Sequence, residues 1–276
     1  MLEYPELHTI ASQMQADLLG KTVTDGVMVK TNNNLFMGAH EPERYAELKG
    51  GVVTGVELHA PEVYIALNNG NGIVIGQCGG KLLLHAPGAK LPTHNICFTF
   101  QDGSCLTYTM MLWSLGIYVR THEEWQQRKA DIDQTHLQPL DSSYDDFAAI
   151  LKKFESEKMP AKTFLSKHIG GVMSTFAAEI LLYAKVYPAA SLHALDTDAQ
   201  KRVYDTIRQI LTSACELGGR VNEMDLHGAK GRYVAMAERK NIGKPCPICG
   251  HALDKTSVGG VTAFCPTCQP KPLRKK

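Results

Sequence analysis

Four cysteines near the end of the chain constrain its fold more than any other feature. Cys246, Cys249, Cys265 and Cys268 stand as two CxxC pairs with fifteen residues between the pairs. Each CxxC turn directs two thiolates at one point, and two such turns on a hairpin complete a tetrahedron around Zn²⁺. The segment VGGVTAF between the pairs is typical of that hairpin. Because four protein ligands leave no open coordination position, the sequence predicts one zinc ion with a structural role.

Basic residues flank this zinc ribbon. RKNIGK precedes it and KPLRKK follows it, and such a cluster can follow the phosphates of a nucleic acid. A solvated run of terminal charges explains the same residues equally well. The net charge of the whole chain is only +1 with histidine neutral, so overall charge does not by itself indicate a nucleic-acid-binding protein.

The first part of the chain favours antiparallel β structure with one helix. LHTIASQMQADLLG has apolar residues at helical spacing and ends at Gly20. Between about residues 50 and 120, the turn segments NNGNG and QDGS each separate two apolar runs, as in β-hairpins. The pattern is typical of an antiparallel β-sandwich or barrel, and we expect a β-sandwich domain with an N-terminal helix at residues 1–125.

Helical patterns dominate the remainder. Residues 121–145 are polar and irregular, so we expect a linker at 126–143. From Tyr144 to about residue 238 the apolar residues recur at helical spacing, with IGGV between two of the helices. We therefore expect a helical domain at 144–238 and a zinc ribbon with a basic tail at 239–276. The predicted fold class is multidomain α+β.

The sequence also bears on location. No apolar run reaches membrane-spanning length, and the N-terminus lacks the pattern of a signal peptide. We expect a cytoplasmic protein that does not associate with a membrane.

Three segments of the chain resemble the Fpg/Nei family of DNA glycosylases, which comprises formamidopyrimidine-DNA glycosylase and endonuclease VIII. MLEYPELHTIA resembles the N-terminal MPELPEVET of the family. HIGGVMSTFAAEILLYAKVYP resembles its helix-two-turns-helix segment, and GKPCPICG with VGGVTAFCPTCQ resembles its terminal zinc finger. The segments occur in the family's order and spacing, so the resemblance covers essentially the full chain.

The resemblance implies a DNA repair protein that binds damaged or structured double-stranded DNA, acts as a monomer and associates with the nucleoid. In the family, the ribbon and the two-turn motif grip the phosphates around a lesion. The damaged base is extruded toward the N-terminus, because chemistry on a base requires its removal from the stack. Together with nearby cations, the resemblance gives six candidate DNA-binding residues: Lys162, Lys167, Gly171, Ser174, Lys244 and Lys255.

The N-terminus matches the catalytic end of the family. There the nucleophile is the amine of a proline exposed by removal of the initiator methionine, and this amine forms a Schiff base with the sugar. Here Leu2 stands at that position, and its bulk should keep Met1 in place and displace the amine by one residue. Such a displacement spoils the geometry of attack. Weak or absent abasic-site lyase activity is therefore expected.

Glu3 and Glu6 match two glutamates of the family motif. The resemblance implies that Glu3 handles protons at the sugar ring and that Glu6 helps to hold the N-terminal turn. A carboxylate that faces a developing cationic sugar can act as acid, base and electrostatic stabiliser. A structural interpretation fits equally well, in which both residues only cap the helix that starts near Leu7.

Several family positions that contact DNA differ in this chain. The strand lysine of the family aligns with Pro61 or Glu62, and the asparagine of its two-turn motif aligns with Ser174. MMLWSLG lacks the arginine of the family's wedge loop but has Leu112 or Trp113 to insert between bases. Each lost cation removes one contact that releases counterions, so weakened DNA binding is expected.

Three functional hypotheses follow. The first is an active glycosylase in which Glu3 activates water and removes a base with little or no strand cleavage. The second is a catalytically inactive relative that binds nucleic acid, and the third is an adaptor that binds protein through the ribbon. The lysines and arginines that remain near the motifs favour the first two.

Overall fold

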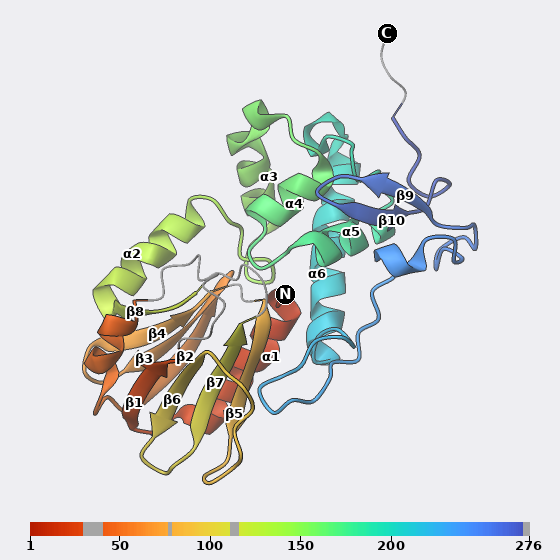
Figure 1. The fold of residues 1–276 in the computed structure, drawn as a ribbon. Coiled ribbons are helices and arrows are strands. Elements are labelled where there is room, and N and C mark those ends of the chain that lie inside the picture. The colour runs from red at the N-terminus through yellow and green to blue at the C-terminus, as the bar shows by residue number, and fades with distance from the viewer. Residues whose placement is uncertain (30–40, 77–78, 111–115, 273–276) are drawn as a thin grey trace. The chain divides into compact units, whose positions relative to one another are not determined.

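The computed structural model describes residues 1–29, 41–76, 79–110 and 116–272 (Figure 1). The chain divides into two compact units, Met1–Ile132 with Leu217–Arg232, and Asp133–Glu216 with Tyr233–Lys276. The segment Leu217–Arg232 therefore belongs to the same unit as the N-terminus. The domain boundaries expected from the sequence stay a prediction.

The first unit contains α1 (Tyr4–Leu18) and two antiparallel four-stranded sheets. One sheet has the order β1 (Val23–Met28), β6 (Ile96–Phe100), β7 (Cys105–Met110) and β5 (Gly80–His85). The other has the order β2 (Val53–His59), β3 (Glu62–Leu67), β4 (Asn71–Ile75) and β8 (Ile117–Thr121). A short 3₁₀ helix, η1, spans Pro42–Leu48. These sheets confirm the predicted antiparallel sandwich with an N-terminal helix.

The core of this unit lies between the inner faces of the sheets and α1. Ile10 and Met14 of α1 pack with Ile65 from one sheet and Phe98 from the other, and all four are at most 1% exposed. Both predicted hairpins form, since β3 pairs with β4 around NNGNG and β6 pairs with β7 around QDGS. The core thus fixes the start of α1, and with it the N-terminus, against the sandwich.

A helix covers the outer face of the second sheet. α2 (His122–Asp133) follows β8 directly, so the prediction of irregular structure at residues 121–145 is wrong for this stretch. The fully buried Trp125 stacks on Tyr64 with ring centroids 4.9 Å apart, and its indole N–H donates to Glu57 over 2.9 Å. The polar composition of α2 reflects a helix that buries only Trp125 and Ile132.

The second unit is helical before its C-terminal ribbon. Its helices are α3 (Tyr144–Lys153), α4 (Ala161–His168), α5 (Ser174–Tyr183) and α6 (Thr197–Glu216), with 3₁₀ turns η2 (Glu155–Glu157), η3 (Leu192–Ala194) and η4 (Arg239–Asn241). The predicted two-turn connection IGGV lies between α4 and α5. The helical pattern expected up to residue 238 is wrong beyond Glu216, where Gly218 and Gly219 adopt positive φ and the helix stops.

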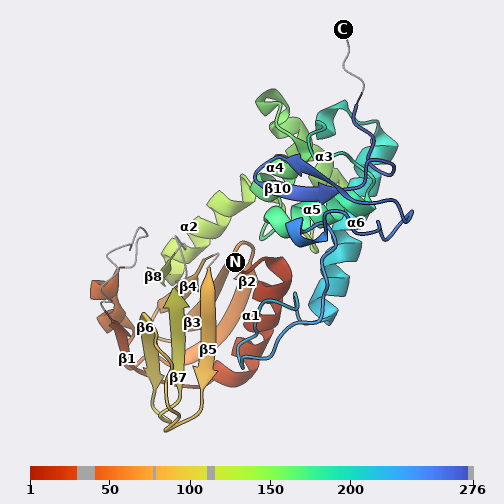
Figure 2. The same cartoon turned by 45° about the vertical axis from the view of Figure 1, so that its right-hand side comes forward.

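The ribbon packs on α5 within this unit. Strands β9 (Asp254–Ser257) and β10 (Val261–Phe264) form the predicted hairpin and lie beside α5 in Figures 1 and 2. Leu253 and Ala263 pack against Leu182 of α5. Buried Gln269 accepts the Cys265 N–H over 2.8 Å and donates to the Val186 carbonyl over 2.7 Å, which ties the ribbon to the helices.

None of the helices within the described ranges combines the length and the apolar character that a membrane crossing requires.

Candidate functional site

A buried arginine joins the two N-terminal glutamates. Arg220 is 4% exposed, and its guanidinium donates from Nη1 to Glu3 over 3.2 Å and from Nη2 to Glu6 over 2.9 Å. Nη2 also donates to the Met1 carbonyl over 2.7 Å. Burial lowers the pKa of Arg220, but the charges of Glu3 and Glu6 outweigh it and hold this pKa above its ordinary value. No motif in the sequence singles out Arg220.

The backbone beside Arg220 requires glycine. Gly219 has φ +86°, and a β-carbon there would lie 2.8 Å from the Glu6 side chain. A β-carbon on Gly231 would lie 2.2 Å from the Gly219 carbonyl oxygen. The close approach brings the Arg220 backbone N–H within 2.8 Å of the Glu6 carboxylate, so both glycines help to place the arginine on the N-terminus.

Glu3 and Glu6 form a capping box at the start of α1. The Glu3 N–H donates to the Glu6 carboxylate over 2.8 Å, and both residues are 2% exposed. Both residues thus cap α1, as the structural interpretation expects. The catalytic role of Glu3 stays a prediction, and its carboxylate lies against Arg220.

Leu2 anchors the chain end from which the Met1 amine projects. Leu2 is 2% exposed and belongs to the core of the first unit, whereas Met1 is 53% exposed. The α-ammonium group of Met1 pairs with Glu223 Oε1 over 3.0 Å. Glu223 lies three residues beyond Arg220, so the same segment holds both the carboxylates and the amine of the N-terminus.

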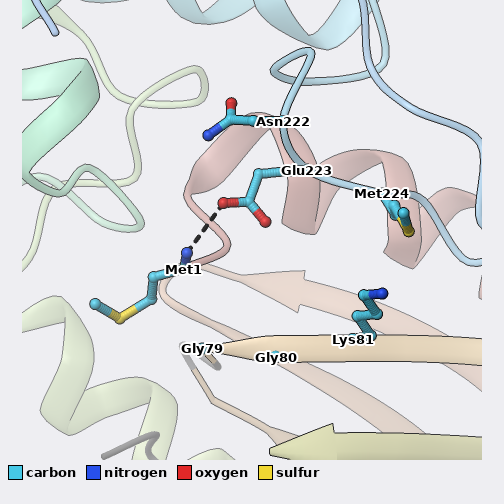
Figure 3. A pocket seen from close by; sticks show the side chains of 7 residues that line it. All are labelled: Met1, Gly79, Gly80, Lys81, Asn222, Glu223 and Met224. Atoms are coloured by element: carbon cyan, nitrogen blue, oxygen red, sulfur yellow. Dashed lines mark hydrogen bonds and ion pairs between the residues drawn. The ribbon is translucent and has the colours of Figure 1, made fainter. Parts of the chain in front are cut away.

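The Met1 amine lies at a pocket of about 430 Å³, shown in Figure 3. The volume is within the ~300–1,000 Å³ common for small-molecule sites. The walls come from the chain start, the start of β5 and the Leu217–Arg232 segment. The described residues that line it are Met1, Gly79, Gly80, Lys81, Asn222, Glu223 and Met224. Glu3 is not among them.

The part of the Leu217–Arg232 segment that follows the pocket residues is also held in place, by contacts with α1 and β5. Gln13 of α1 donates to Asp225 over 2.8 Å and accepts the Leu226 N–H over 2.9 Å. Leu226 is fully buried in the core, and its carbonyl accepts the Leu84 N–H over 2.9 Å. Glu223 is therefore held between two anchored points, Arg220 on one side and Asp225 with Leu226 on the other.

Only a weak signal for this site is present in the sequence. GGRVNE places a positive and a negative residue directly after a helix stop. Neither the helix propensity of these residues nor their spacing indicates that they pair with the start of the chain. The partner is 217 positions away for Arg220 and Glu3, and only tertiary structure brings them together.

The four cysteines meet at one point. The Sγ atoms of Cys246, Cys249, Cys265 and Cys268 all lie within 4.8 Å of one another. Tetrahedral Zn²⁺ with Zn–S bonds of about 2.3 Å requires sulfur atoms about 3.8 Å apart, and the Cys249–Cys265 separation is 3.4 Å. Backbone N–H groups also donate to Sγ of Cys246 and of Cys265 over 3.4 and 3.3 Å. The donor set therefore fits the ion predicted from the sequence.

The candidate DNA-binding residues all lie in the second unit. Gly171, with φ +72°, makes the turn before α5, and the exposed Ser174 is the first residue of that helix. Lys167 is exposed and pairs with Glu157 over 2.5 Å. In the ribbon, Lys244 and Lys255 are both exposed.

Lys162 does not fit the expected role. It is 2% exposed, and its Nζ donates to the carbonyl of Gly259 over 3.4 Å. Its ammonium group supports the hairpin turn of the ribbon from α4, so its assignment as a surface phosphate contact is corrected.

Glu62, at the expected place of the family lysine, is also buried. It is 4% exposed, accepts from Arg128 Nη2 over 2.6 Å and accepts from the Tyr118 hydroxyl over 2.9 Å. This position therefore carries an internal ion pair. Leu112 and Trp113, the expected wedge, lie outside the described residues.

Two family models match the chain. Residues 1–111 match the formamidopyrimidine-DNA glycosylase N-terminal domain, and residues 243–271 match the zinc finger found in FPG and IleRS. The sandwich with its N-terminal site and the ribbon with its thiolate site thus place the chain in the class of zinc-finger proteins with a DNA glycosylase fold.

Relatives that match the chain over its full length carry the same family name as the N-terminal model. The chain is 28% identical to formamidopyrimidine-DNA glycosylase of Solibacter usitatus over 98% of this chain and 99% of the relative. It is 26% identical to the Listeria innocua protein of the same name over 98% and 100%. The chain is thus similar over nearly its full length to proteins of the Fpg/Nei family, and its four-cysteine site is that of a structural zinc ion.

Solved structures share the fold. Lactococcus lactis Fpg in complex with DNA containing N7-benzyl-Fapy-dG superposes with a TM-score of 0.84 at 20% identity, over 98% of this chain and 100% of the other. MutM of Thermus thermophilus gives a TM-score of 0.81 at 21% identity, over 98% and 100%.

Proposed function

We propose that this chain is a DNA repair protein that binds damaged double-stranded DNA and hydrolyses the bond between a damaged base and its sugar, with weak or absent strand cleavage. One observation carries the proposal: the N-terminal amine and a glutamate meet at a pocket, in a chain related over its full length to formamidopyrimidine-DNA glycosylases.

The first unit supplies the groups for base removal. A base must leave the helical stack to be reached, and the pocket beside Met1 is large enough to receive a small planar group. When the glycosidic bond breaks, positive charge develops on the sugar, and fixed carboxylates at the site stabilise it. Lys81 on the pocket wall is suited to a neighbouring phosphate.

Strand cleavage requires more than this arrangement offers. The imine that leads to cleavage needs an amine with a lone pair directed at the sugar. Leu2 occupies the family's nucleophile position but is buried in the core. The Met1 nitrogen, as an ammonium group, is paired with Glu223. Both features support base excision that leaves an intact abasic site.

The second unit supplies phosphate contacts. Lys167, Ser174, Lys244 and Lys255 present exposed donors from the two-turn motif and the ribbon, and such contacts position a protein on DNA without reading sequence. Bound zinc holds the two CxxC turns together and so keeps the ribbon folded. We also propose that the protein acts as a monomer in the cytoplasm, associated with the nucleoid.

The test uses duplex oligonucleotides that each carry one oxidised or alkylated base. Hot alkali cleaves a strand wherever a base has been removed. Any cleavage seen in samples without alkali is therefore due to the protein itself. Alkali-dependent cleavage at a damaged base, with little cleavage without alkali, is the expected result. Binding of the damaged duplex without base release from any substrate would instead identify an inactive relative. An absence of both binding and release would favour the adaptor.

A further inference from the structure

We propose that Glu223, and not Glu3, is the catalytic carboxylate in the pocket, and that Glu3 serves as a partner of Arg220. This inference rests on the proposed base-excision function and names the group that performs it.

Glu3 and Glu223 differ in their access to the pocket. The side chain of Glu3 is 3% exposed, whereas that of Glu223 is 17% exposed. Glu223 lines the pocket, and Glu3 is not among its described lining residues. A group that assists a reaction must come within hydrogen-bond reach of the reacting atoms. Among the described residues, Glu223 is the carboxylate that lines the pocket.

The partners of the two carboxylates differ as well. Glu3 lies 3.2 Å from the Arg220 guanidinium, which also binds Glu6. Glu223 Oε1 accepts from the Met1 ammonium group over 3.0 Å and lies 3.6 Å from Arg220. Its second oxygen, Oε2, has no hydrogen-bond partner within the described part of the chain. That oxygen is available to a substrate or to water.

The charges of the cluster favour a cation in the pocket. Three carboxylates, those of Glu3, Glu6 and Glu223, surround two cations, Arg220 and the Met1 ammonium. With all five groups ionised, this cluster carries one net negative charge, and Glu223 is its member that faces the pocket, which Lys81 also lines. A sugar that becomes positively charged beside Glu223 would balance this charge, which is the condition for electrostatic stabilisation of the transition state.

Glu223 is also held in position before substrate binds. Arg220 is fixed by Glu6 on one side of it, and Asp225 is fixed by Gln13 on the other. The Glu223 carbonyl accepts the Gly231 N–H over 3.3 Å, which closes the segment on itself. Figure 3 shows Glu223 and Met1 facing each other. A catalytic group fixed in this way loses little entropy in the reaction.

The proposed step is hydrolysis. A water molecule donates a proton to Glu223 Oε2 while its oxygen forms a bond to C1′ of the deoxyribose. The bond from C1′ to the base nitrogen breaks, and its electron pair leaves with the base, which takes up a proton from solvent. Glu223 then returns its proton to water. The products are a free base and an abasic site, and no covalent intermediate with the protein forms.

The experiment compares Glu223→Gln and Glu223→Asp with Glu3→Gln in full-length, zinc-loaded protein. The readouts are the single-turnover rate of base release, the melting temperature, and affinity for duplex DNA with a tetrahydrofuran abasic-site analogue. For Glu223→Gln we expect at least about a hundredfold loss of rate, as for removal of a general base. Affinity for the analogue should change less than about threefold, and Glu223→Asp should recover part of the rate because it restores the charge.

Glu3→Gln is the matched comparison. We expect a lowered melting temperature, because it weakens a buried ion pair, and less than about tenfold loss of rate below that temperature. A Glu223→Gln rate within about threefold of wild type, or a larger rate loss in folded Glu3→Gln, would overturn the inference while leaving the proposed function intact. Wild-type protein that releases no base from any duplex would overturn both.

Discussion

The guanidinium of Arg220 lies 2.9 Å from the carboxylate of Glu6, although 214 positions separate the two residues in the sequence. This contact closes the Leu217–Arg232 segment onto the start of α1, and the pocket wall is a consequence of it. The N-terminal site is therefore formed by segments of one unit that are distant in the sequence. The integrity of Arg220 should decide whether the site exists at all.

Arg220→Met should destabilise the protein strongly. It leaves Glu3 and Glu6 as buried carboxylates without their cation, and removal of one partner from a buried ion pair costs about 3–5 kcal/mol. Lys201→Met is the control, because Lys201 and its partner Asp205 are both more than half exposed, and exposed pairs contribute only about 0–1 kcal/mol. Urea unfolding should resolve the two variants. Equal stabilities would show that Arg220 does not support the fold.

The ribbon should depend on zinc. Freshly purified protein should contain one zinc ion per chain by metal analysis, and Cys265→Ala should lose it together with the ribbon fold, because metal binding supplies most of the stability of such small units. The circular dichroism of the first unit's sheets should persist. Cys215→Ala, which changes a half-buried thiol outside the ribbon, should retain the metal. Wild-type protein without zinc would refute the assignment.

Sequence reasoning succeeded where the decisive interactions are local. The CxxC spacing specifies the zinc site, and the turns NNGNG and QDGS specify their hairpins. It failed where burial depends on distant parts of the chain. Trp125 anchors a helix whose other residues are almost all polar. Lys162 resembles a surface cation in sequence but lies under the ribbon hairpin. The roles of Arg220 and Glu223 become evident only in the folded protein, where both lie beside the N-terminus.

A buried carboxylate should make stability depend on pH. Glu179 of α5 is fully buried and accepts the backbone N–H groups of Met236 and Ala237, each over 2.8 Å. Burial raises the pKa of Glu179 to about 6, and the hydrogen bonds oppose the shift only in part. The folded state therefore retains a proton that the unfolded state loses near its ordinary pKa of about 4.3.

Because the folded state binds the proton more tightly, this residue's contribution to stability is greatest below about pH 4.3 and falls as pH rises to about 6. The loss amounts to about 2 kcal/mol, from 1.36 kcal/mol per unit of pKa. Glu179→Gln does not titrate, so the difference in unfolding free energy between the two proteins should change by this amount across that range. A constant difference from pH 4 to 6.5 would contradict the prediction.

Phosphate contacts should come from the exposed lysines of the ribbon. Charge reversal in Lys244→Glu or Lys255→Glu should weaken binding to all duplexes alike and reduce the slope of log K against log salt by about 1 per lost contact. Lys201→Glu on α6 changes an exposed lysine outside the two motifs and should have little effect. Binding that does not change between low and moderate salt would argue against a phosphate-contacting role and for the adaptor.

The chain end should remain intact and should not form an imine efficiently. Leu2 is bulky and buried, so an intact mass that includes Met1 is expected. The Met1 ammonium is paired with Glu223, and a protonated amine cannot attack a sugar carbon. Borohydride, which traps such imines, should therefore give little cross-linking between the protein and abasic DNA, although the same DNA is bound. Efficient trapping by protein whose mass includes Met1 would show that this displaced amine is the nucleophile, and would replace the hydrolytic step with a covalent one.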